Sequence, residues 1–207
     1  MNNNIKLLLF ISSILPGLCL FTQAQGPVEK ISEENDISIY KKEKENSRNY
    51  IVVFDVNATP GEAENLLLYP KAYKSFVNNI IDVKELNEIN DSLQYFWVLI
   101  GVKNILTREG VIRTTRSMKG SNSIIINQKL DKKHPYNDDF KKIRKFDTRW
   151  KINRKDRRKI VVELNYTGGK DENSRFVNRI LDKILVNKLQ TIAEKVRNTL
   201  EMEASIY

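Results

Sequence analysis

The chain has 207 residues, of which 41% are hydrophobic, and a formal net charge of +9. This length and composition suit one globular domain with a sizeable core. A single histidine, His134, and a single cysteine, Cys19, argue against Ser-His-Asp and Cys-His catalytic systems and exclude a structural zinc site by ligand count. No cofactor and no metal are therefore expected.

The first 24 residues have the pattern of a secretory signal peptide. Lys6 precedes an apolar stretch over 7–21, and the segment ends at Thr22-Gln23-Ala24, where a signal peptidase reads small residues. A membrane anchor is the alternative, but the run is about 15 residues long where roughly 20 are needed. A lipoprotein signal would require a smaller residue than Leu18 before Cys19. We expect cleavage near Ala24 and a periplasmic or extracellular protein, which would lack cysteine and so any disulfide.

The basic charge is scattered among acidic residues except in "NRKDRRK" at 153–159. An excess of positive charge suits nucleic acid or anionic membranes, and export argues against nucleic acid. The cluster is most simply a solvated hairpin turn, and transient contact with anionic lipid head groups is the alternative. A monomer is the expectation for the assembly state.

The N-terminal part predicts a lead-in, two strands and two short helices. Residues 25–36 are polar without periodicity, which indicates a flexible lead-in to a domain over 37–207. Segments 37–45 and 49–58 alternate as paired strands. Thr59, Pro60 and Glu62 predict a capped helix that runs to about residue 69. Pro70 then limits that helix, and residues 71–78 predict a second one.

The middle of the chain predicts strands at about 80–88, 92–102, 109–119, 122–130, 143–153 and 158–167. The stretch "KFDTRWKIN" alternates apolar and polar residues, as in an antiparallel sheet with one solvated face. "LQYFWVLI" is apolar on both faces, which suggests a strand that is covered on both sides or a second contact surface.

The last segment is the clearest helix. Apolar residues recur at steps of three and four from Phe176 to Leu200, after Asn173 or Ser174 as a possible cap. About 30 helical residues would be roughly 45 Å long. The elements predict an α+β fold in which a curved antiparallel sheet of about seven or eight strands wraps around this C-terminal helix.

In order and spacing, four stretches resemble the START lipid-transfer domains, within the helix-grip superfamily that includes the birch-pollen-allergen-like proteins. They are "NDISIYKKE", "VNATPGEAENLLLYPKAYKSFVNNIIDVKEL", "LTREGVIRTTRSM" and "RWKINRKDRRKIVVELNYTGGKDENSRFVNRIL". Glu109-Gly110 departs from the family, which has Asp-Phe after the motif Arg108. Thr114 stands where some sterol-binding members carry a charged cavity residue, and the inward choice among Arg113, Thr114 and Arg116 stays open.

The resemblance implies binding or transfer of a lipid or other hydrophobic molecule, in a cavity between the sheet and the last helix. Aromatic residues on the sheet would serve as core or as cavity wall. The expected lining is Trp97, Leu99, Thr114, Ile124, Ile126, Phe146, Trp150, Val162, Leu164, Val177, Ile180, Leu181 and Ile184.

Two alternatives remain beside a carrier. One is a superfamily enzyme, cyclase- or hydrolase-like, which would need acid-base groups in the cavity; Glu163 and Tyr166 are generic candidates. The other is a filled structural domain without a ligand. No catalytic constellation stands out, so a binding protein rather than an enzyme is expected.

Overall fold

The computed structural model describes residues 27–44, 47–90, 92–102, 106–133, 140–143, 145–169 and 175–204. The predicted signal peptide and His134 lie outside these residues, so the expectations for them stay predictions.

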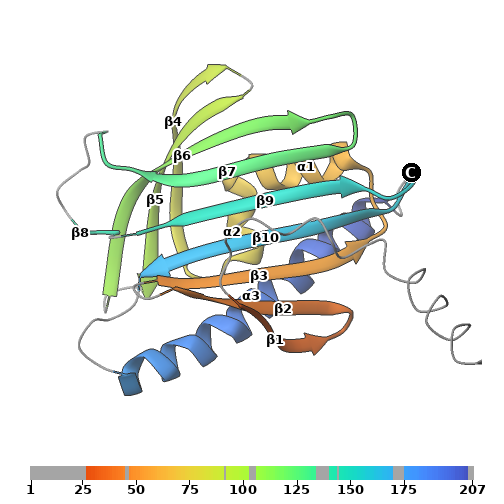
Figure 1. Cartoon of the computed structure of the whole chain (residues 1–207). Helices are drawn as coiled ribbons and strands as arrows, with labels where there is room; N and C mark the ends of the chain where they lie inside the picture. Colours follow the sequence, from red (N-terminus) through yellow and green to blue (C-terminus); the bar gives the residue numbers. More distant parts are fainter. Residues whose placement is uncertain are drawn as a thin grey trace, which may run out of the picture.

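One antiparallel sheet of ten strands forms most of the molecule, against the seven or eight that the sequence predicts (Figure 1). The strands are β1 (Val28–Glu34), β2 (Ile37–Lys44), β3 (Ser47–Val56), β4 (Ile80–Asn90), β5 (Leu93–Val102), β6 (Leu106–Lys119), β7 (Ser123–Asp131), β8 (Lys141–Lys142), β9 (Asp147–Arg154) and β10 (Ile160–Gly169). Their order is β1-β2-β3-β10-β9-β7-β6-β5-β4, and the short β8 pairs parallel to β6.

Alternation of apolar and polar residues gives the sheet two distinct faces. The helices cover the inner face, on which Val52 and Phe54 of β3, Trp150 of β9 and Val162 of β10 are almost fully buried. The residues between them turn to the outer face, as a period of two requires. The predicted α+β architecture, a large antiparallel sheet with a long C-terminal helix, is confirmed.

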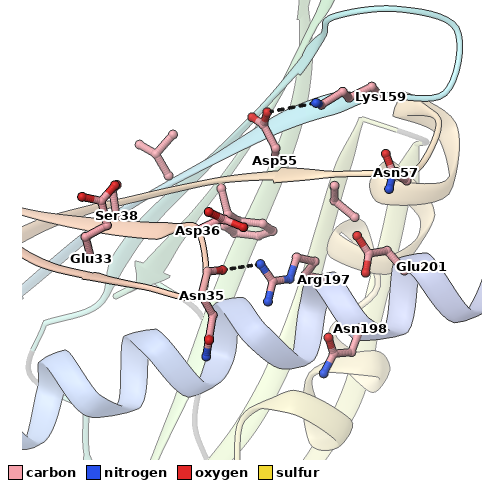
Figure 2. A pocket seen from close by; sticks show the side chains of 13 residues that line it. Glu33, Asn35, Asp36, Ser38, Asp55, Asn57, Lys159, Arg197, Asn198 and Glu201 are labelled. Atoms are coloured by element: carbon pink, nitrogen blue, oxygen red, sulfur yellow. Dashed lines mark hydrogen bonds and ion pairs between the residues drawn. The ribbon is translucent and has the colours of Figure 1, made fainter.

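The strand β1 corrects the expectation that residues 25–36 lack regular structure. Asn35 and Asp36 both adopt positive φ, 51° and 57°, so they form the two-residue turn that matches the twist of a hairpin. The turn also rests on the C-terminal helix, where Arg197 donates to the Asn35 carbonyl at 2.5 Å (Figure 2). Gln190 donates to the Glu34 carbonyl at 3.1 Å. These contacts hold a polar strand that has little apolar surface of its own.

Two short helices follow β3, as predicted. In α1 (Pro60–Leu68), Thr59 and Glu62 form the expected capping box, with Glu62 N to Thr59 Oγ1 at 3.3 Å and Thr59 N to Glu62 Oε2 at 2.6 Å. The hydrogen bond from the Thr59 backbone lowers the pKa of Glu62. A 3-10 turn (Pro70–Ala72) and α2 (Tyr73–Phe76) complete the segment, which lies on the inner face.

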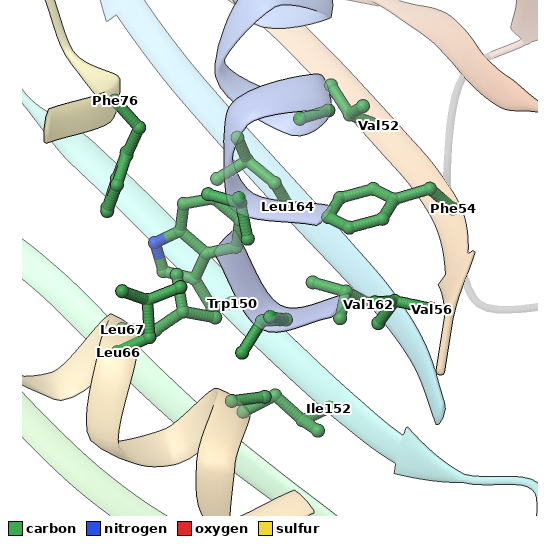
Figure 3. Close-up of a cluster of buried hydrophobic side chains, with 14 of the residues drawn as sticks. Val52, Phe54, Val56, Leu66, Leu67, Phe76, Trp150, Ile152, Val162 and Leu164 are labelled. Carbon is green, nitrogen blue, oxygen red and sulfur yellow. The ribbon is translucent and has the colours of Figure 1, made fainter. Parts of the chain in front are cut away.

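The core lies between the sheet and the C-terminal half of α3 (Arg175–Ala204), a helix of 30 residues. Leu189, Ala193, Val196 and Leu200 of α3 are at most 2% exposed. Figure 3 shows this helix packed between aromatic and aliphatic side chains of β3, β9 and β10 and the side chains of α1 and α2. Burial of this apolar surface is the main term that stabilises the fold.

The N-terminal half of α3 contacts the sheet through charges instead. Asp182 accepts from Arg48 Nε at 2.8 Å and from Lys41 Nζ at 3.1 Å, and Arg48 also donates to Asn178. Arg48 is only 8% exposed in its side chain, so this cluster is largely removed from water. We call Arg48, Lys41 and Asp182 the ionic cluster. The N-terminal half of α3 is therefore attached to the sheet by charged groups, and the C-terminal half by apolar packing.

Candidate functional site

An apolar hollow of about 290 Å³ lies between the inner face of the sheet and the helices. We call it the inner pocket. Its lining is Tyr73, Val77, Asn79, Ile80, Val98, Ile100, Ile112, Gln128, Ile143, Phe146, Thr148, Trp150, Leu164, Tyr166, Leu185, Lys188, Leu189 and Ile192. Most of these side chains are hydrophobic, as is usual for sites that take small apolar molecules, and the volume is at the lower end for such sites.

The hollow exists because the buried apolar residues form two separate clusters. The larger one joins α1, α2 and the C-terminal half of α3 to β3, β7, β9 and β10. The smaller one, which includes Phe96, Val98 and Ile112, lies on the β4–β6 part of the sheet. The contacts of α3 with the sheet are mainly to β2 and β3. The helix therefore leaves a space over the β4–β6 side, and the inner pocket lies there.

Gly110 of β6 lies close to the smaller apolar cluster. An added Cβ there would lie 2.9 Å from Leu130 Cδ1 and 3.2 Å from Ile143 Cδ1. Both neighbours pack against the smaller cluster or belong to it. An aromatic side chain at this place, as in the family that the sequence resembles, would therefore displace them.

The polar groups of the inner pocket are few, and Tyr73, Gln128 and Thr148 among them have hydrogen-bond partners. Thr148 Oγ1 donates to Gln128 Oε1 at 3.0 Å, and Tyr73 donates its hydroxyl proton to the Leu67 carbonyl at 2.8 Å. Burial raises the pKa of Tyr73 and of Tyr166 above the usual tyrosine value, so both phenols stay protonated at neutral pH. The indole N–H of Trp150 is buried without a hydrogen-bond acceptor, and Figure 3 shows it directed towards α2.

A second hollow of about 300 Å³ adjoins the inner pocket on its solvent side, and we call it the outer cleft. The two share Val77, Asn79, Lys188 and Ile192, so they adjoin each other between the segment after α2 and the middle of α3. Among the described residues that line either hollow, Lys188 carries the only full charge at neutral pH. We call the boundary between the two hollows the mouth of the inner pocket.

The structure places three of the predicted lining residues, Phe146, Trp150 and Leu164, in the inner pocket. Four more lie on the same face but are packed away from it. Thr114 is fully buried, and Ile124, Ile126 and Val162 belong to the larger apolar cluster. Thr114 faces inward and Arg113 is exposed on the outer side, while Arg116 pairs with Glu64 of α1. Ligand contact by any of these residues stays a prediction.

Trp97 and Leu99 are a correction, because they lie on the outer face. Their neighbours Val98 and Ile100 line the inner pocket, and successive residues of a strand turn to opposite faces. Trp97 Nε1 donates to Glu109 Oε2 at 3.0 Å, and Lys142 Nζ pairs with Glu109 Oε1 at 2.8 Å. β5 carries apolar residues on both faces, so the sequence did not indicate which set faces the pocket.

The predicted lining residues of α3 are also corrected. Ile180, Leu181 and Ile184 are 46%, 41% and 45% exposed; none of them lines the inner pocket, and Ile184 lines the outer cleft. The side chain of Val177 lies outside the described part of the chain. Leu185 and Leu189 line the inner pocket instead. The inward positions that precede them, Asn178 and Asp182, belong to the polar attachment. Because these two residues are polar, the sequence did not indicate which side of this part of the helix faces inward.

A larger groove of about 780 Å³ lies on another side of the molecule, between the β1–β2 turn, the end of β3 and the end of α3 (Figure 2). Its lining is mainly polar and charged. Asp55 pairs with Lys155 at 2.7 Å and with Lys159 at 3.6 Å, both from the basic 153–159 turn. These pairings match a solvated turn, and the groove lacks the apolar lining of a lipid site.

In the part of the chain that the structure describes, no group of three potential metal-ligating side chains occurs. Within the same residues, no helix has both the length and the hydropathy to cross a membrane.

No protein-family model and no curated protein matches the chain. Solved structures do match it. A STAR-related lipid transfer protein from Xanthomonas axonopodis has a TM-score of 0.71 at 15% identity, covering 84% of this chain and 98% of that one. Human StAR-related lipid transfer protein 5 has a TM-score of 0.71 at 11% identity, covering 88% and 90%.

An aromatase/cyclase from Streptomyces sp. R1128 is a more distant match, with a TM-score of 0.52 at 12% identity, covering 76% of this chain and 96% of that one. At these identities the similarity concerns the fold. The chain has the helix-grip fold of the StAR-related lipid transfer domains, as the sequence predicts.

Proposed function

We propose that this protein binds a lipid or other hydrophobic small molecule in the inner pocket and transfers it. The observation that carries the proposal is the apolar hollow between α3 and the β4–β6 side of the sheet. Burial of an apolar ligand there contributes about 25 cal/mol per Å² of surface removed from water. The shared fold with lipid transfer proteins supports the same use of this space.

We further propose that binding is not followed by a chemical step. The ionisable side chains that line the inner pocket are Tyr73, Tyr166 and Lys188. Both phenols hold their protons at neutral pH, and Lys188 lies at the mouth. The other generic candidate, Glu163, is on the outer face of β10 and accepts from Asn165 at 2.6 Å. A general acid and base acting on one substrate would have to lie within reach of the same atoms.

Filling the inner pocket is expected to weaken ligand binding. Leu185→Trp would place a large ring in the hollow and lower the affinity for N-phenyl-1-naphthylamine, a neutral fluorescent probe, by roughly tenfold, since about 1–2 kcal/mol of apolar contact is lost. Leu181→Trp is the matched control, because Leu181 lies four residues earlier on α3 and lines neither hollow. Fluorescence titration measures both. Equal affinities for the two variants, or no probe binding by the unaltered protein, would contradict the proposal.

We also propose that the protein is exported and cleaved near Ala24. Mass spectrometry of the protein recovered from its own cells is expected to show a chain that begins at Gln25. A recovered chain that retains residues 1–24 would disprove this processing. Organic extraction of the same sample identifies any lipid that remains bound.

A further inference from the structure

We infer that the preferred ligand is a single-chain amphiphile whose acidic head group binds Lys188 at the mouth of the inner pocket. This inference rests on the proposed function. The structure supplies three arguments for it: the position of Lys188, its lack of an acidic neighbour, and the shape of the space that it borders.

Lys188 lies where the inner pocket meets the outer cleft, and it lines both. Its aliphatic stem can follow the apolar wall while its ammonium group stays in water at the mouth. A ligand with its apolar part inside would bring its head group to this boundary. The other polar side chains at the boundary, including Asn79 and Asn187, are neutral and could assist an anion without competing for it.

No acidic residue pairs with Lys188 among the residues that the structure describes. The positions one turn away on α3 are Ile184, Leu185, Thr191 and Ile192, none of which is acidic. The nearest acidic residues of α3 are engaged elsewhere. Asp182 is held in the ionic cluster, and Glu194 accepts from Gln190 at 3.0 Å and from Asn35 at 2.9 Å. The charge of Lys188 is therefore available to a ligand.

The shape of the space favours one narrow chain. The inner pocket holds about 290 Å³, and the adjoining outer cleft, of about 300 Å³, leads out past Ile184. A bulky or two-chain lipid would exceed the enclosed part. A linear tail fits it while its head group stays at Lys188. An acidic head group on such a tail combines the charge and the volume that the site offers.

The test compares two ligands that differ only in the head group. Dodecanoate and 1-dodecanol, each below its aggregation concentration, displace N-phenyl-1-naphthylamine from the unaltered protein and from two variants at pH 7.5. Lys188→Met is expected to lower the affinity for dodecanoate by about fivefold, which corresponds to the loss of one solvent-exposed ion pair. The affinity for 1-dodecanol is expected to stay unchanged. Lys183→Met is the control, because Lys183 is an exposed lysine of α3 that lines neither hollow. Raised salt should shrink the difference.

Each other result overturns the inference in a recognisable way. If Lys188→Met leaves dodecanoate binding unchanged, or weakens both ligands equally, the lysine does not recognise a head group. If the unaltered protein binds the probe and the alcohol but not the acid, the inference fails while the proposed function stands. If the unaltered protein binds no probe, the proposed function fails and the inference with it.

Discussion

Replacing Trp150 with alanine is expected to lower the free energy of unfolding by about 3–5 kcal/mol, the range for loss of a large buried aromatic side chain. Trp150 is 2% exposed and lies where the larger apolar cluster meets the inner pocket. Its ring lies between Phe76 of α2 and Leu164 of β10 (Figure 3), and alanine would leave a cavity beside the existing hollow. Urea unfolding followed by far-ultraviolet circular dichroism measures the change.

Trp97→Ala is the matched control for this experiment. Trp97 is only partly buried on the outer face, where it donates to Glu109 and lies under Lys84, whose Nζ is 5.1 Å from the ring centroid. Its loss removes one hydrogen bond and a weaker packing contact, so a cost of about 1–2 kcal/mol is expected. Equal costs for the two tryptophans would contradict the assignment of Trp150 to the central core.

Asp182→Leu is expected to destabilise the protein by about 2–3 kcal/mol. The substitution leaves Arg48, 8% exposed in its side chain, buried without its carboxylate. Removal of one partner from a buried ion pair costs up to about 3–5 kcal/mol, and the 21% exposure of Asp182 places this case below that range. The N-terminal half of α3 should lose hydrogen-exchange protection first, because the ionic cluster fastens that half to β2 and β3.

The double variant Arg48→Met with Asp182→Leu tests the cause. Removing both charges should recover most of the lost stability, since no buried charge is then unpaired. If the double variant is less stable than Asp182→Leu alone, the packing of Arg48 rather than its charge is what matters.

The ionic cluster also gives the stability a pH dependence. Burial would raise the pKa of Asp182, but hydrogen bonds from Lys41 and Arg48 outweigh burial and lower it below the usual aspartate value. A carboxyl group with a lowered folded-state pKa stabilises the protein above its unfolded pKa, near 3.9. This contribution to stability is lost as the pH falls through the pKa that Asp182 has in the folded protein. In the Asp182→Leu variant, the loss of stability at low pH that is due to protonation of Asp182 should be absent.

The sequence predicts the parts of this fold that follow one local rule. The alternation in β3, β9 and β10 places the core residues correctly, and Thr59, Pro60 and Glu62 specify the start of α1. β1 was missed because its residues are polar. The sequence feature that does indicate a hairpin here is the pair Asn35-Asp36. Both residue types tolerate positive φ, and the pair lies between two segments that are long enough to be strands.

The candidate site was predicted less well because it depends on orientation. Trp97 and Leu99 were assigned to the wrong face, since both faces of β5 are apolar and the pattern of the strand alone does not indicate which set faces the helices. On α3, the apolar side chains of Ile180 and Leu181 suggested an inward face, yet Asp182 takes that place because Arg48 and Lys41 pair with it. Long-range charge pairing of this kind is not visible in helical periodicity.

The pairing of β3 with β10 has a consequence for how the chain acquires its structure. Val56 lies opposite Ile160 and Ser47 opposite Gly169, so the central ladder joins segments from opposite ends of the chain. Closing so long a loop costs conformational entropy before the native contacts form that offset this cost. Folds with many such contacts therefore form slowly, in about milliseconds to seconds. Until the C-terminal quarter has been synthesised, β3 can pair with β2 but lacks its second partner, β10, and the nascent polypeptide has no complete sheet.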